Sequence, residues 1–123
     1  MITNFEEETL ELSEYEKETI VPWLIKGFSK RTKDNPIKAR DIVLSCNKVL
    51  ESTGSSYRIT QPRLRKISNY IRTNGLLPLI ATSKGYYSST DKQEIRDQIE
   101  SLTQRANSIQ RSADGLLKFL KNE

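Results

Sequence analysis

The feature that most constrains the fold of this chain is a heptad pattern in its last quarter. Apolar side chains recur there at alternating spacings of four and three residues, at Ile95, Ile99, Leu102, Ala106, Ile109, Ala113, Leu116 and Leu120. An unbroken series of this kind is typical of a helix that packs against another helix in a coiled coil. Asp91 can cap this helix, which at 1.5 Å per residue is roughly 46 Å long.

We predict that this helix makes the protein a homodimer, because the remaining chain offers no surface long enough to cover it. These eight apolar residues, which we call the seam, would form the dimer interface. The alternative is a helix that folds back on its own domain, against a helix near the N-terminus. Ala106 and Ala113 bury little area, and Leu117 and Phe119 widen the stripe as in a helix bundle. Few charges flank the seam, so the sequence does not distinguish a parallel from an antiparallel orientation of the two helices.

The other residues of the 123-residue chain are enough for one small domain with a modest core. Apolar residues make up 35% and charged residues 29% of the sequence, which suits a helix-rich protein. We expect no membrane-spanning helix, since no run of about 18 apolar residues exists, and no secretion signal at the acidic N-terminus. A single cysteine, Cys46, gives no internal disulfide, and we expect a cytoplasmic protein.

Charge is distributed unevenly along the chain. Residues 1–20 carry seven acidic side chains and one basic one, and residues 21–90 carry thirteen basic and three acidic ones. Residues 91–123 are balanced, so the whole chain has a net charge of +4. A middle region this basic is expected of a protein that binds a polyanion, although a basic domain without such a partner is the plain alternative.

The chain divides into an acidic arm (1–12), a helical domain (13–90) and the C-terminal helix (91–123). Within the domain, Ser13 and Glu16 form a capping-box pattern at the start of a helix over about 13–30. Pro22 should kink or split that helix because it lacks an amide donor. A very short strand is expected at Ile37, and a second helix follows over about 38–50, with Cys46 on its apolar stripe.

A third helix begins after Thr60 and ends at Asn74-Gly75, a pair that favours a left-handed cap. Its apolar residues share one face, and basic and amide side chains cover the rest. The following segment places β-compatible residues on both sides of the turn Ser83-Lys84-Gly85, which predicts a hairpin.

The segments "IKARDIVLSCNKVL", "TQPRLRKISNYIRTNG" and "LPLIATSKGYYSS" occur in the order of the first helix, recognition helix and wing of a winged helix-turn-helix domain. The region 13–90 resembles that family. It resembles more loosely the small, poorly characterised winged-helix proteins of bacterial phages and mobile elements. The expected fold is therefore mainly α with a small β-hairpin wing, followed by a long C-terminal helix that can form a coiled coil.

The resemblance implies that the third helix enters the major groove of duplex DNA. Arginine can pair with guanine edges there, and asparagine or glutamine with adenine. The residues that match these roles by position are Gln61, Arg63, Arg65, Lys66 and Asn69, with Arg72 at phosphate and Lys84 at the tip of the wing.

We expect no enzyme, catalytic residue, metal, cofactor or small-molecule ligand, because the chain has no histidine, no glycine-rich phosphate loop and no cluster of metal ligands. The expected function is sequence-selective binding of duplex DNA by a dimer, as a transcription regulator or a replication accessory factor, and the looser resemblance adds a phage-encoded protein as one option. The alternative is an adaptor between proteins that acts through the coiled coil and the acidic arm.

Overall fold

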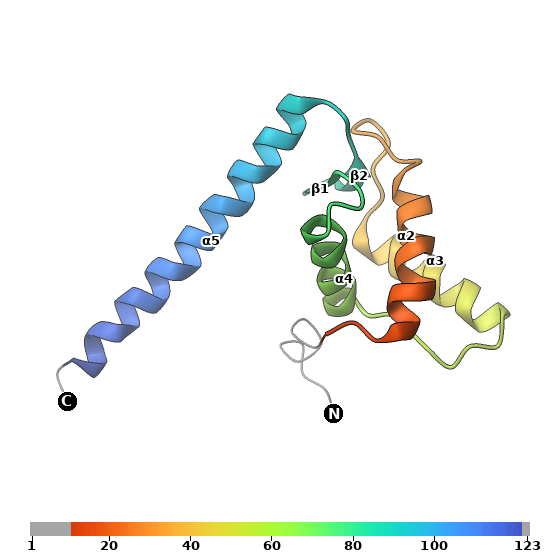
Figure 1. Ribbon diagram of the computed structural model, residues 1–123, viewed down its shortest axis with the longest axis horizontal. Coiled ribbons are helices and arrows are strands. Elements are labelled where there is room, and N and C mark those ends of the chain that lie inside the picture. Colours follow the sequence, from red (N-terminus) through yellow and green to blue (C-terminus); the bar gives the residue numbers. More distant parts are fainter. Residues whose placement is uncertain (1–10, 122–123) are drawn as a thin grey trace. The chain divides into compact units, whose positions relative to one another are not determined.

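The computed structural model describes residues 11–121, and the chain separates into two compact units, 1–89 and 90–123. The first unit contains a π-helix, η1 (Glu16–Ile20), the helices α2 (Val21–Phe28), α3 (Ala39–Ser52) and α4 (Gln61–Thr73), and the strands β1 (Leu79–Thr82) and β2 (Gly85–Ser88). The second unit is one helix, α5 (Lys92–Leu120) (Figure 1). The expected mainly helical architecture, with one hairpin and a long C-terminal helix, is confirmed. The bulk of the expected acidic arm, residues 1–10, lies outside the described residues.

The first helical segment begins with the predicted capping box. The Ser13 amide donates to Glu16 Oε1 at 2.9 Å, and the Glu16 amide donates to Ser13 Oγ at 3.2 Å. The predicted interruption takes the form of a wide π turn, in which the Val21 amide donates to the Glu16 carbonyl oxygen. Pro22 follows in the first turn of α2, a position at which helices tolerate proline.

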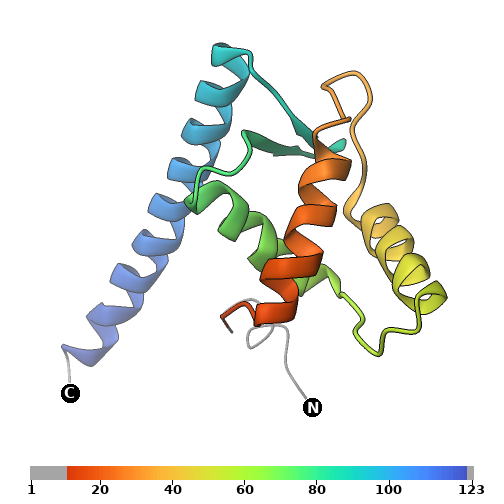
Figure 2. The same ribbon diagram turned by 45° about the vertical axis from the view of Figure 1, so that its right-hand side comes forward.

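The helices of the first unit converge on one apolar core (Figure 2). Each helix contributes one face, as its sequence pattern predicts. The buried side chains include Ile20, Leu24, Phe28, Ile42, Cys46, Leu50, Ile59, Leu64, Ile67 and Ile71. Cys46 is a core residue, as predicted, and burial raises the pKa of its thiol.

Both ends of α4 have the predicted caps. Thr60 Oγ1 accepts from the Arg63 amide at 3.3 Å, and Pro62 lies in the first turn. At the other end Gly75 has a φ of +61°, and the Leu76 amide donates to the Ile71 carbonyl at 3.0 Å. This geometry satisfies carbonyls that the end of the helix leaves open.

The hairpin pairs Leu79 with Ser88 and Thr82 with Gly85 in an antiparallel register. Where a very short strand was expected, Ile37 forms a single isolated β-bridge: its amide and carbonyl both bond to Tyr86, at 2.9 and 2.7 Å. Tyr86 also stacks on Phe28 with ring centroids 5.5 Å apart. These contacts attach the start of β2, close to the turn of the hairpin, to the end of α2 and to the segment before α3.

Helix α5 is capped by Asp91, whose Oδ1 accepts from the amides of Gln93 and Glu94 at 2.8 and 3.0 Å. The large side chains of the second half of its seam are exposed in the single chain: Ile109 by 72%, Leu116 by 68% and Leu120 by 60%. Across residues 11–121, no helix combines the length and the apolar character needed to cross a bilayer.

Candidate nucleic-acid interface

Helix α4 separates its side chains sharply into a buried and an exposed face. Leu64, Ile67 and Ile71 are completely buried in the core. Gln61, Arg65 and Asn69 follow one another at intervals of four residues and are exposed, so they form a polar ridge along the helix. We call these three residues the α4 ridge. Its side chains offer the guanidinium and amide groups that can recognise base edges.

Arg63, which the sequence also placed in the interface, points into a different environment. Its Nε donates to Glu16 Oε2 and its Nη2 to Glu16 Oε1, both at 2.7 Å. The two side chains are only 13% and 3% exposed. Tyr57 completes the cluster by donating its hydroxyl to Glu16 Oε2 at 2.6 Å. The charge of Arg63 is therefore balanced inside the first unit rather than presented on the α4 ridge.

The protonation of this cluster follows from its contacts. Burial alone would raise the pKa of Glu16, but hydrogen bonds from Arg63, Tyr57 and the Ser13 amide outweigh burial and lower it from 4.5 to about 2. The hydrogen bond with Glu16 raises the pKa of Arg63, and burial beside the carboxylate raises that of Tyr57. Glu16 is thus a carboxylate, and Arg63 a cation, at any ordinary pH.

The segment before η1 reaches the same side of α4. Arg63 Nη2 donates to the Glu11 carbonyl oxygen at 2.8 Å, and Lys66 Nζ lies 3.7 Å from Glu11 Oε1. The Glu11 side chain is 92% exposed, and Lys66 is 24% exposed. An acidic segment therefore lies beside the basic helix, and one of its carboxylates contacts a lysine that the sequence assigned to DNA.

Arg72 and Lys84 occupy the hairpin side of the first unit. Arg72 is half-buried, and its Nε donates to the Leu79 carbonyl at 3.0 Å, which links the end of α4 to β1. Lys84 lies in the two-residue turn between the strands and is exposed, and its amide donates to Thr82 Oγ1 at 3.1 Å. Its ammonium group is thus carried at the tip of the hairpin.

The predicted DNA-contacting residues consequently fall into two groups. The α4 ridge and Lys84 are exposed, while Arg63, Lys66 and Arg72 each contact a neighbouring segment of the first unit. The capping-box pattern identifies Glu16 as a helix cap, but it does not indicate the contact of Glu16 with Arg63. The partner lies 47 residues away, and no local pattern reports a pairing at that distance.

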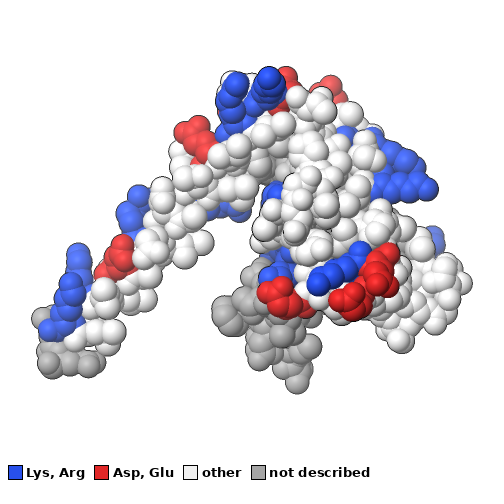
Figure 3. Space-filling view, in the orientation of Figure 1, with Lys and Arg blue, Asp and Glu red and all other residues white. Residues whose placement is uncertain are grey.

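The predicted dimer residues lie along one face of α5, since spacings of three and four bring side chains together on a helix. Charged side chains of both signs are distributed along this helix, as Figure 3 shows. The seam is thus an apolar line within a surface of mixed charge.

Comparison of the chain with protein-family models, with curated proteins and with solved structures found no match. Its function is therefore inferred from its own residues and their arrangement.

Proposed function

We propose that this protein binds duplex DNA as a winged helix-turn-helix domain, with α4 as the recognition helix and the β1–β2 hairpin as the wing. The observation that carries the proposal is the two-sided character of α4. Leu64, Ile67 and Ile71 hold one face in the core, which fixes the direction in which the α4 ridge points. A helix held in this way can present the ridge to the major groove, which is wide enough to admit a helix.

The spacing of the ridge matches the size of a short recognition site. Gln61 and Asn69 are eight residues apart, which corresponds to roughly 12 Å along a helix. At about 3.4 Å for each base pair, the ridge spans three to four base pairs. Arg65 in its middle has the geometry for the two acceptors of guanine, and the two amides suit adenine.

The remaining charges would position the protein on the phosphate backbone. Residues 21–90 carry ten more basic than acidic side chains, and Lys84 lies at the tip of the hairpin, where a wing can reach phosphate or the minor groove. Lys66 and Arg72 lie at the sides of α4 and are secondary candidates for phosphate. Arg63 is left out of the proposed contacts because Glu16 balances its charge.

Dimerisation through α5 belongs to the same proposal. Exposed apolar seams usually mark an interface, and the large seam side chains of the second half of α5 are exposed in the single chain. A dimer would present two copies of α4 and bind two half-sites. Sequence-selective binding of this kind suits a transcription regulator or a replication accessory factor.

The test is a selection of bound duplexes from random DNA, followed by affinity measurements on the selected site. Arg65→Ala should cost about 1–3 kcal/mol and relax specificity at one base pair. Arg105→Ala removes the same charge from α5 and serves as the matched control, for which we expect little change. If Arg65→Ala behaves like Arg105→Ala on the selected site, α4 is not the recognition helix.

A role as an adaptor between proteins is the second candidate, and the exposed seam of α5 is the observation that favours it. The two functions differ in their response to salt. DNA binding through phosphate contacts weakens steeply as salt rises, because counterions are released on binding. Absence of salt-dependent binding to any duplex would favour the adaptor.

A further inference from the structure

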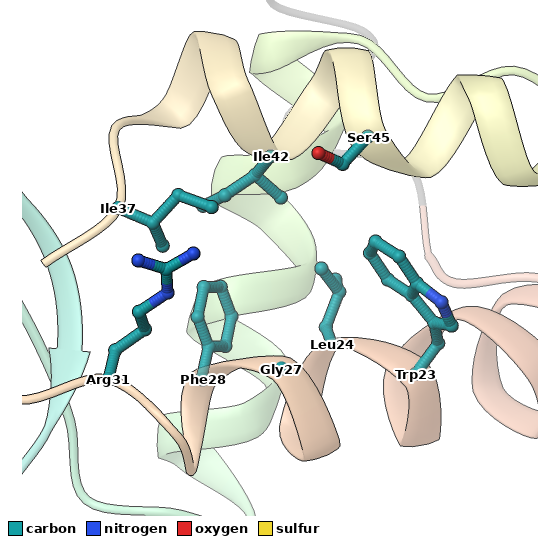
Figure 4. Close-up of a pocket in the computed structure, with 8 residues that line it drawn as sticks. All are labelled: Trp23, Leu24, Gly27, Phe28, Arg31, Ile37, Ile42 and Ser45. Carbon is teal, nitrogen blue, oxygen red and sulfur yellow. The ribbon is translucent and has the colours of Figure 1, made fainter.

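A pocket opens between α2 and α3, on residues that the proposed DNA interface does not use (Figure 4). Its volume is about 180 Å³. Leu24 and Phe28 of α2 face Ile42 of α3 across it, and Trp23 and Arg31 lie at its two ends. An apolar cavity of about 150 Å³ accommodates benzene, so this pocket has room for one ring with a small substituent.

Arg31 gives the pocket a charged end. Its Nη1 makes one long hydrogen bond, 3.4 Å, to Asn35 Oδ1. Within the part of the chain that the structure describes, no carboxylate lies within ion-pair distance of this guanidinium. A cation at the end of an apolar pocket favours a ligand that carries an anionic group on an apolar body.

Gly27 leaves one wall of the pocket free of a side chain. It is the penultimate residue of α2 and has an ordinary helical backbone, which any residue adopts, and glycine in the interior of a helix costs about 1 kcal/mol relative to alanine. A Cβ added there would have no other atom within 4 Å. The backbone does not require glycine at this position, and the absence of a side chain leaves the wall of the pocket open.

We propose that this pocket binds a small organic carboxylate with an apolar body of about one ring, whose carboxylate pairs with Arg31. The ring would lie beside Gly27, over the floor that Leu24, Phe28 and Ile42 form, and the Ser45 hydroxyl on α3 is available for a polar substituent. The ligand would also contact two residues that hold the hairpin in place. Phe28 stacks on Tyr86 of β2, and Ile37, at the edge of the pocket, forms a β-bridge with the same tyrosine.

The experiment uses benzoate as the probe and benzamide as its uncharged counterpart, titrated into the full chain and followed by NMR. Trp23 is the only tryptophan, so its indole N–H reports from the pocket without ambiguity. Benzoate should shift the signals of Trp23, Gly27 and Ser45 in a saturable way with a dissociation constant in the millimolar range, and benzamide should bind more weakly.

Two variants and a control decide the assignment. Gly27→Leu fills the pocket and should abolish the shifts while it raises the melting temperature, because leucine is the better helix former. Arg31→Gln should weaken benzoate roughly tenfold and remove the preference over benzamide. Gly115→Leu makes the same substitution in α5 and should bind benzoate normally.

Three results would overturn the proposal. The first is the absence of saturable shifts at pocket residues at tens of millimolar benzoate. The second is unchanged binding by a folded Gly27→Leu chain. The third is equal affinity for benzoate and benzamide in the wild type, which would leave the pocket without the anionic ligand class assigned to it. None of these measurements involves DNA, so they are independent of the proposed function.

Discussion

Glu16 and Arg63 form a two-point ion pair that joins the first helical turn of the chain to α4, and both of its N···O distances are 2.7 Å. The pair is nearly inaccessible to solvent, with Glu16 3% and Arg63 13% exposed. Breaking such a pair from one side leaves an uncompensated buried charge, which costs far more than loss of an exposed ion pair.

Glu16→Gln should therefore destabilise the fold by about 3–5 kcal/mol, measured by urea denaturation at neutral pH. The matched variant is Glu16→Gln combined with Arg63→Met, which removes the stranded cation and should recover much of the loss. Glu14→Gln serves as the exposed control, since that carboxylate is 81% exposed and lies 4.0 Å from Lys17. A loss as small for Glu16→Gln as for Glu14→Gln would contradict a structural role for the pair.

The same pair should make stability depend on pH in acid. The pKa of Glu16 falls from 4.5 to about 2 on folding, so the contribution is complete above pH 4.5 and is lost as pH falls towards 2. This shift corresponds to roughly 3 kcal/mol. Other carboxylates titrate in the same range, so the quantity to measure is the stability difference between wild type and Glu16→Gln. That difference should shrink between pH 4.5 and 2, and a constant difference would show that Glu16 is not the titrating group.

Lys84→Ala tests the wing. If the lysine at the hairpin tip contacts phosphate, its loss should weaken binding to all duplexes alike and make the slope of log K against log salt less steep by about 0.9 for each wing that contacts the duplex. Lys48→Ala removes an exposed lysine from α3 and is the control, with an unchanged slope expected. Equal slopes for the two variants would remove the hairpin from the DNA interface.

Glu11→Gln tests whether the acidic segment competes with DNA for Lys66. Loss of the ion pair between the Glu11 carboxylate and Lys66 Nζ, which are 3.7 Å apart, should raise the affinity for DNA at low salt. The gain should disappear as salt screens the charges. Deletion of residues 1–12 is a poorer test, because Leu12 is 6% exposed and belongs to the core. A gain that persists unchanged at high salt would argue against electrostatic competition.

Ile109→Glu combined with Leu116→Glu tests the α5 dimer. Both side chains are exposed in the single chain, so the substitutions should leave the first unit folded. Charges at these seam positions would be buried in a dimer, so ultracentrifugation should show a monomer. Ser101→Glu with Ser108→Glu adds the same charge outside the seam and should leave the dimer intact. A wild-type chain that is monomeric at tens of micromolar would exclude the dimer.

Most of the fold was predictable because its signals are local. The Ser13–Glu16 capping box, the interruption at Pro22 and the left-handed Gly75 each depend on residues a few positions apart. The position of Arg63 was not predictable, because helical periodicity places it on the polar side of α4 and says nothing about Glu16. The α2–α3 pocket was missed for a related reason, since it arises where two helices leave a gap beside Gly27.

The close approach of β2 to the segment before α3 sets how much sequence change the hairpin can accept. Gly85 has a φ of +133°, and a Cβ there would lie 2.5 Å from the Ile37 carbonyl oxygen. Every missense change in this codon would force the backbone of Ile37 away from Tyr86. Gly27 and Gly115, whose surroundings are open, carry no such restriction. In a saturation library selected for folding, position 85 should therefore stay monomorphic while those two glycines diversify.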